Sequence, residues 1–106
     1  MGEWVDVAPA KDFQPGTSRR LDVDDVAIAV FNLDGEYYAV EDVCTHDYSP
    51  LEGGEVQGEE IICPRHGARF NIKSGEALTA PAYEPLTTFP VRLENGMVQV
   101  MDDRWD

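Results

Sequence analysis

The two cysteines and the two histidines of this chain occur as two tight pairs. One residue separates Cys44 from His46, sixteen residues follow, and two residues separate Cys63 from His66. Thiolate and imidazole groups are preferred ligands of transition metals, so four of them at two short spacings can close on one centre. The chain must therefore fold so that two loops meet, and this requirement limits the architectures open to it.

A β-hairpin is predicted immediately before the first pair. Residues 26–33 (VAIAVFNL) and 36–43 (EYYAVEDV) are rich in β-branched and aromatic side chains, which favour strands. They flank Asp34-Gly35, a dipeptide that favours the tight turn of a two-residue hairpin loop. The two segments should therefore pair as antiparallel neighbours.

A second hairpin is predicted near the end of the chain. Residues 87–94 (TTFPVRLE) and 97–102 (MVQVMD) flank Asn95-Gly96, which is an equally strong turn signal. Pro90 lies within the first of these strands and cannot donate a hydrogen bond to a ladder. This strand should therefore occupy a sheet edge.

The fold class follows from the number and shortness of the strands. Residues 3–8 and 17–23 are two further strand candidates on either side of a turn-prone Gln-Pro-Gly. Many short strands with little helical pattern predict an all-β protein, an antiparallel β-sandwich or barrel. The length of 106 residues is that of a single domain.

The centre of the chain, from about residue 41 to about residue 83, differs from its flanks. It is rich in Gly and Pro and contains both Cys/His pairs, which predicts loops joined by short strands such as 61–63 and 69–72. We interpret it as a loop-rich subdomain that a metal centre would order. The predicted organisation is one domain, residues 1–106, with this subdomain inserted in a β base formed by residues 1–40 and 84–106.

Acidic residues outnumber basic ones by 21 to 8, so the net charge is −13. This balance argues against binding to nucleic acid or to an anionic membrane surface. The sequence also contains no apolar run long enough to span a bilayer, and its first residues resemble no signal peptide. We expect a cytoplasmic protein, and we expect most of the acids between Glu41 and Glu60 to form a solvated surface.

The residue types leave several kinds of site open. A structural zinc module would suit two Cys and two His, although zinc motifs usually place at least two residues within each ligand pair. The cysteines could instead be free thiols or form a disulfide. A Cys-His catalytic dyad is a further alternative, but no third orienting group or oxyanion hole is evident beside it.

The segment CTHDYSPLEGGEVQGEEIICPRHGARFNIKSGEAL resembles the cluster-binding motif of the Rieske family. It has both ligand pairs, a proline after the second cysteine and a glycine after the second histidine. The resemblance implies one [2Fe-2S] cluster per chain, with Cys44 and Cys63 on one iron and His46 and His66 on the other. The order of hairpins and loops along nearly the whole chain is similar to that of small Rieske ferredoxins.

The neighbours of the ligands resemble low-potential members of this family. High-potential relatives have a disulfide between the cluster loops and two hydroxyl side chains that donate hydrogen bonds to sulfur. The matching positions here are Ser49, Arg65, Ala68 and Phe70. The disulfide cannot form and both hydroxyl donors are missing. We therefore expect a reduction potential at the low, ferredoxin end of the Rieske range.

Both irons would be fully coordinated, so the chain alone should not be an enzyme. The resemblance implies a soluble one-electron carrier that works as one component of a larger system. It would be a monomer that passes electrons from an NAD(P)H-dependent flavoprotein reductase to a terminal, ring-hydroxylating oxygenase (dioxygenase). The alternative is the small Rieske subunit of an NAD(P)H nitrite reductase. Asp47 and Tyr48 follow His46 directly, and we expect them to help dock a basic partner surface.

Overall fold

The computed structural model describes residues 3–43, 51, 53–64, 67–80 and 84–103. These residues form ten strands and a single turn of 3₁₀ helix, with no α-helix among them. Within the same residues, no helix is long and apolar enough to cross a membrane. The elements are β1 (Trp4–Pro9), η1 (Ala10–Asp12), β2 (Ser18–Val23), β3 (Val26–Leu33), β4 (Glu36–Glu41), β5 (Glu55–Gln57), β6 (Glu60–Ile62), β7 (Arg69–Asn71), β8 (Thr88–Phe89), β9 (Val91–Glu94) and β10 (Met97–Met101).

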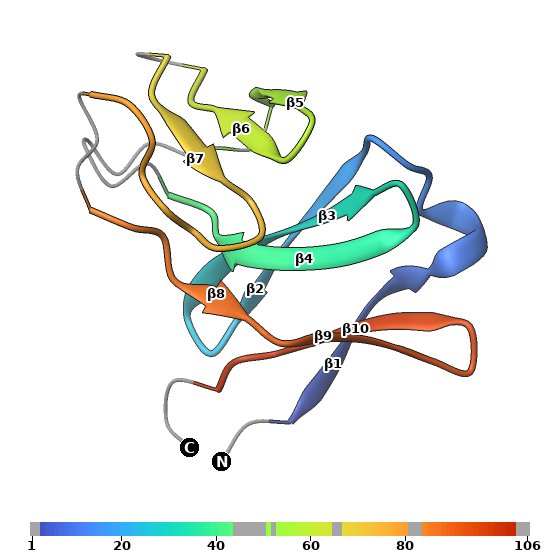
Figure 1. The fold of residues 1–106 in the computed structure, drawn as a ribbon. Coiled ribbons are helices and arrows are strands. Elements are labelled where there is room, and N and C mark those ends of the chain that lie inside the picture. The colour runs from blue at the N-terminus through green and yellow to red at the C-terminus, as the bar shows by residue number, and fades with distance from the viewer. Residues whose placement is uncertain (1–2, 44–50, 52, 65–66, 81–83, 104–106) are drawn as a thin grey trace.

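The strands form three antiparallel sheets in the orders β1-β10-β9, β2-β3-β4-β8 and β5-β6-β7. Figure 1 shows the four-stranded sheet between the other two, so the molecule has three layers. The all-β prediction with antiparallel sheets is confirmed. The sheet β5-β6-β7 lies entirely within the segment that contains the Cys/His pairs, whereas the division of the chain at about residues 41 and 83 stays a prediction.

Both predicted hairpins are present, and their turns have the backbone that the sequence requires. Asp34 and Gly35 have φ of 55° and 92°, and Asn95 and Gly96 have φ of 52° and 79°. Positive φ at both central residues matches the right-handed twist of the flanking strands. Each turn thereby fixes the register of its strand pair, β3 with β4 and β9 with β10.

The predicted strand over residues 87–94 is wrong as a single strand. It is divided at Pro90 into β8, which pairs with β4, and β9, which pairs with β10. Pro90 cannot donate to either ladder, but its carbonyl accepts a hydrogen bond from the Met101 N–H at 3.1 Å. Both pieces are edge strands, as a proline-containing segment should be, and the chain passes here from one sheet to another.

Another tight turn joins β2 to β3 through Asp24 and Asp25, whose φ values are 50° and 66°. Left-handed backbone is unfavourable for residues with a side chain, and the Asp34-Gly35 and Asn95-Gly96 turns have Gly at the second position. We expect Asp25→Gly to stabilise the protein by about 0.5–1 kcal/mol in chemical unfolding. Asp25→Ala removes the same charge but keeps the strain, so it should give no gain; equal stabilities of the two variants would contradict this explanation.

The central strand β3 is buried on both faces. Ile28 and Val30 face the three-stranded sheet of the chain ends, whereas Ala29 and Phe31 belong to a second hydrophobic cluster that includes residues of β6 and β7. This double burial explains the nearly continuous apolar run of the strand, because side chains on opposite faces both meet a core. One strand therefore supports two hydrophobic cores.

Candidate metal centre

The β6–β7 loop positions the second predicted cysteine. The Cys63 N–H donates to the Ala68 carbonyl at 2.7 Å, and the Gly67 N–H donates to the Cys63 carbonyl at 3.0 Å. Gly67 has a φ of 75°, which a residue with a side chain adopts at a cost. These bonds close a short loop of which Cys63 is the first residue.

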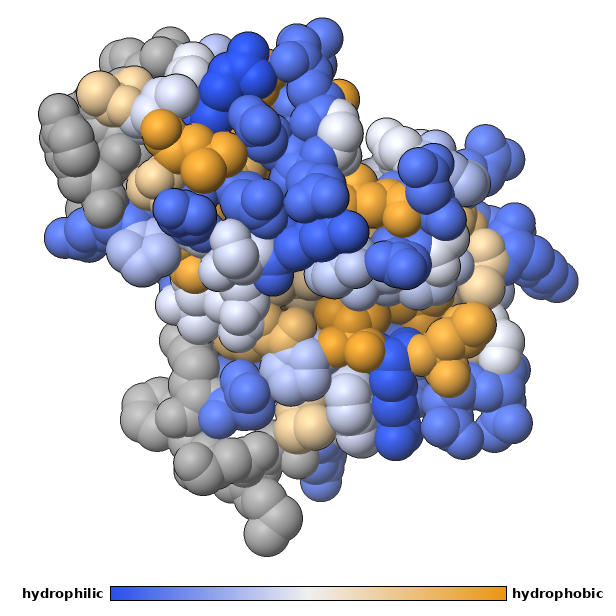
Figure 2. All heavy atoms as spheres, viewed as in Figure 1, coloured by the Kyte–Doolittle hydropathy of each residue, from blue (hydrophilic) through white to orange (hydrophobic). Residues whose placement is uncertain are grey.

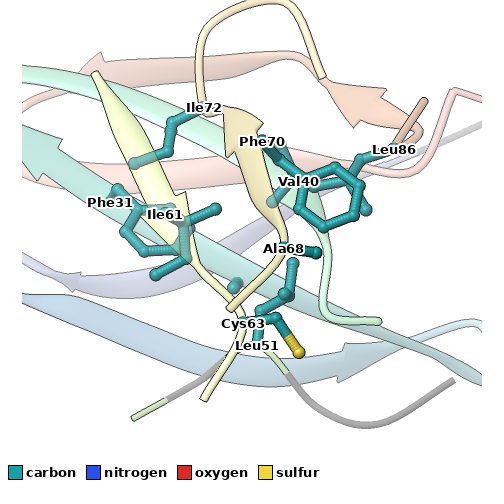
Figure 3. Close-up of a cluster of buried hydrophobic side chains, with 10 residues drawn as sticks. Phe31, Val40, Leu51, Ile61, Cys63, Ala68, Phe70, Ile72 and Leu86 are labelled. Carbon is teal, nitrogen blue, oxygen red and sulfur yellow. The ribbon is translucent and has the colours of Figure 1, made fainter. Parts of the chain in front are cut away.

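The Cys63 thiol is free and the residue is 1% exposed. It lies in a cluster with Leu51, Ala68, Phe70 and Ile61, all of which are 0–1% exposed. Figure 3 shows Cys63 at one end of this cluster, beside Leu51 and Ala68. A metal centre that used this sulfur would therefore have apolar side chains, and not water, on this side.

Leu51 brings the end of the first ligand loop to Cys63, and Asp42 fixes that end. The Leu51 N–H donates to Oδ1 of Asp42 at 2.8 Å. The Asp42 N–H donates to the Ala27 carbonyl at 2.8 Å, which ties this residue to β3. Residues 42 and 51 are therefore held together, and the loop between them begins and ends at fixed points.

Asp42 is a residue of this site that the sequence analysis missed. It was expected on a solvated acidic surface, but it is 4% exposed, and its Oδ2 lies 2.8 Å from Nε of Arg20. The only signal available was its place between an apolar strand and a candidate ligand. Its partner Arg20 is far away in sequence, and no local pattern could have identified it.

Gly54 keeps the two loops close to each other. A Cβ added at Gly54 would overlap the Ile62 carbonyl oxygen and would lie 3.0 Å from the Leu51 carbonyl oxygen and 3.2 Å from Cδ of Pro64. The Gly54 N–H also donates to the Leu51 carbonyl at 2.9 Å. The absent side chain therefore allows the end of the first loop to pack directly against the residues on either side of Cys63.

Two basic side chains that follow the second ligand pair in sequence, Arg69 and Lys73, lie beside acids. Arg69 lies 3.3 Å from Glu60, and Lys73 lies 3.5 Å from Glu59. Desolvation opposes the charge of Lys73, but the neighbouring Glu59 acts against it, and the net effect raises the pKa of Lys73. Figure 2 shows a mainly hydrophilic face over the sheet β5-β6-β7, whereas apolar side chains appear between β4 and β9.

Of the four predicted ligands, the structure describes Cys63 alone. Cys44, His46 and His66 lie outside the described residues. The same holds for several neighbours singled out in the sequence, namely Asp47, Tyr48, Ser49 and Arg65. The structure thus places both ends of the first loop and the base of the second, and it brings these fixed points together through Leu51 and Gly54.

Three antiparallel sheets, with a buried free thiol at the base of the β6–β7 loop, define a small all-β protein. The chain belongs to the Rieske [2Fe-2S] domain family, whose model matches residues 3–90. The cofactor of this family is the cluster that the Cys/His pattern implied. The donor set fits it, since the family requires two thiolates and two imidazoles and the chain has both.

Individual relatives agree with this assignment. The chain is 42% identical over 89 residues to the 3-phenylpropionate/cinnamic acid dioxygenase ferredoxin subunit of Escherichia coli K12, covering 83% of each chain. It is also similar to a chain in a solved complex of reduced oxygenase and oxidised ferredoxin in carbazole 1,9a-dioxygenase. That similarity has a TM-score of 0.87 and 40% identity, and it covers 92% of this chain and 91% of the other.

A nitrite reductase relative shares the fold alone. The small subunit assigned to an NADH-dependent nitrite reductase of Mycobacterium tuberculosis superimposes with a TM-score of 0.85 over 96% of each chain, at 23% identity. At that identity the likeness carries no information about partners or substrates.

Proposed function

We propose that this protein is the ferredoxin component of a multicomponent dioxygenase system and carries single electrons from a reductase to a terminal oxygenase. The observation that carries the proposal is the 42% identity to a dioxygenase ferredoxin subunit over 83% of both chains. The nitrite reductase alternative has support from the fold only. Electrons would come from an NAD(P)H-dependent flavoprotein reductase, and we expect the carrier to be a cytoplasmic, single-domain monomer.

We assign the cluster to Cys44 and Cys63 on one iron and to His46 and His66 on the other. When bound, the cluster supplies a site that accepts and releases one electron. Neutral imidazoles in place of two thiolates make the centre easier to reduce than an all-cysteine cluster. The burial of Cys63 and its place at the base of a hydrogen-bonded loop support the assignment.

The residues of the chain itself hold and shield the centre. The apolar side chains of Leu51, Ala68 and Phe70 pack in the same cluster as Cys63 and exclude water from its sulfur side. Gly54 and Asp42 set the spacing of the two loops. Such a preformed scaffold limits structural change between the oxidised and reduced protein, which suits a carrier that must react with two partners.

The experiment that tests this function combines spectroscopy with electron delivery. The purified protein should be red-brown, and its dithionite-reduced form should give the low average g value of a mixed Cys/His cluster in EPR. Photoreduced protein should then reduce a ring-hydroxylating oxygenase in single-turnover assays. A protein that contains zinc and no iron would refute the cluster, whereas a cluster that passes electrons only to a nitrite reductase would refute the dioxygenase assignment.

The missing hydroxyl donors lead to a prediction for the reduction potential. Ala68 is fully buried in the cluster that contains Cys63, so Ala68→Ser should add a hydrogen-bond donor at the sulfur side of the centre. A hydrogen bond to a charged group contributes about 1.5–3 kcal/mol, so the midpoint potential should rise by roughly 60–130 mV at most. Phe70→Tyr should shift it in the same direction.

The control for this change is Ala77→Ser. Ala77 packs against the rim of the same cluster, so this variant adds an identical hydroxyl at the margin of the same core. Redox titration of the three variants against the unmodified protein measures the effect. The explanation fails if Ala68→Ser and Phe70→Tyr leave the midpoint where it was, or if Ala77→Ser moves it as far.

A further inference from the structure

The carboxylate of Asp42 has a position that requires an explanation. Its side chain is fully buried, with 0% exposure, although it stands two residues before Cys44 at the start of the first ligand loop. A buried carboxylate is costly unless hydrogen bonds and an opposite charge compensate it. Both kinds of compensation are present, and each comes from a different part of the molecule.

The first contact is a hydrogen bond that holds the two ends of the loop together. Oδ1 of Asp42 accepts the Leu51 N–H at 2.8 Å, so one carboxylate oxygen joins the two ends of the loop. Leu51 is 0% exposed and belongs to the same hydrophobic cluster as Cys63. The bond therefore connects the start of the first loop to the side chain that packs beside the second loop's cysteine.

The second contact is electrostatic. Oδ2 of Asp42 lies 2.8 Å from Nε of Arg20, which belongs to β2. The two partners are unequally exposed, since the Arg20 side chain is 42% exposed and the Asp42 side chain is 0% exposed. The guanidinium therefore neutralises the buried carboxylate while part of it remains in contact with water.

We propose that Asp42 and Arg20 form a charge-balanced positioning pair, which closes the first ligand loop and sets the reduction potential of the cluster. This inference rests on the cluster assigned under the proposed function. It adds that the carboxylate holds the loop closed through Leu51, and that Arg20 prevents the buried negative charge from disfavouring reduction.

The charge argument makes predictions of opposite sign for the two partners. Reduction adds one negative charge to the centre, so a nearby negative charge lowers the midpoint potential and a positive one raises it. Arg20→Gln removes the positive charge that lies beside the Asp42 carboxylate and should lower the midpoint. Asp42→Asn removes the negative charge that lies beside the Arg20 guanidinium and should raise the midpoint, although less, because Arg20 is partly screened by solvent.

The experiment measures the midpoints of Arg20→Gln, Asp42→Asn and the double variant at one pH and one ionic strength. The double variant should return close to the starting value, and Arg20→Lys, which restores the charge, should lie close to it as well. Arg19→Gln is the matched control, because it removes the same charge from the neighbouring position of β2, where the side chain contacts the Phe13 ring and the Asp12 carbonyl. It should leave the midpoint nearly unchanged.

A second measurement tests loop closure without reference to the cluster. Hydrogen exchange at the Leu51 amide should be at least about tenfold faster in Asp42→Ala, because a hydrogen bond to a charged acceptor is lost. Asn retains an oxygen at the same place, so Asp42→Asn should keep most of the protection. The chelator-induced loss of iron should follow the same order, slow for Asn and fast for Ala.

The outcomes separate this inference from the proposed function. Shifts of opposite sign with recovery in the double variant support the pair, and so does Leu51 protection that depends on the residue at position 42. Shifts of the same sign, or no shift in either single variant, overturn the electrostatic role, and unchanged exchange in Asp42→Ala overturns loop closure. A wild-type protein without a [2Fe-2S] cluster would instead refute the proposed function, and the exchange measurement would still decide the positioning role.

Discussion

Cys63→Ala should yield a colourless protein that retains no iron. The thiolate is the ligand that the second loop supplies in our assignment, and the described residues offer no other thiolate to replace it, since Cys63 is their only cysteine. Its side chain is 1% exposed among apolar neighbours, so water has little access to the vacated position. Iron and sulfide analysis together with the visible spectrum measures the effect.

The control for this variant must disturb the same core and leave the ligands in place. Ile61 is also 1% exposed and packs in the cluster that contains Cys63. Ile61→Val should cost about 0.5–1.5 kcal/mol in unfolding and still retain the cluster. If Cys63→Ala kept a full complement of iron and the same EPR signal, Cys63 would be removed from the ligand set.

Gly54→Ala should also lead to loss of iron, for a steric reason. The new methyl group would overlap the Ile62 carbonyl oxygen and press on Pro64, the residues on either side of Cys63. Neither backbone segment can yield without shifting the cysteine, so the two ligand loops must separate. Overpacking of this kind costs about 1–3 kcal/mol, and we expect the iron content and the stability to fall together.

The adjacent glycine provides the matched control. Gly53 has a φ of 89°, but an added Cβ would meet nothing within 4 Å. Gly53→Ala should therefore lose about 1–2 kcal/mol through left-handed backbone strain and still bind iron. Iron retention in Gly54→Ala equal to that in Gly53→Ala would show that the close contact at Gly54 does not set the loop spacing.

The sequence predicted most of the strands because their signals are local. Asp34-Gly35 and Asn95-Gly96 each specify a turn by their own backbone preferences, and the flanking strands follow. The separation of β8 from β9 was not predictable in this way. Pro90 indicated an edge, but the exchange of sheet partners at this residue depends on β4 and β10, which are distant in sequence from one another.

The site also has a part that is predictable from local sequence and a part that is not. The ligand types and their spacing lie in two short segments, which is why the family could be recognised from them. The contacts that hold those segments in place join distant residues, such as Arg20 with Asp42 and Gly54 with Ile62. A single sequence contains no signal for such pairs, and an acid-rich segment gives no reason to single out Asp42 as the buried one.

The two cores carried by β3 have a consequence for how the protein acquires its cofactor. Among the residues that the structure describes, the core that includes Ile28 and Val30 contains none from the ligand loops, whereas the core that includes Phe31 contains Cys63 itself. A newly made chain can therefore complete the first core before any metal arrives. The cluster would then be inserted into a protein whose first core is already packed. Packing of the second core around Cys63 would complete the folding.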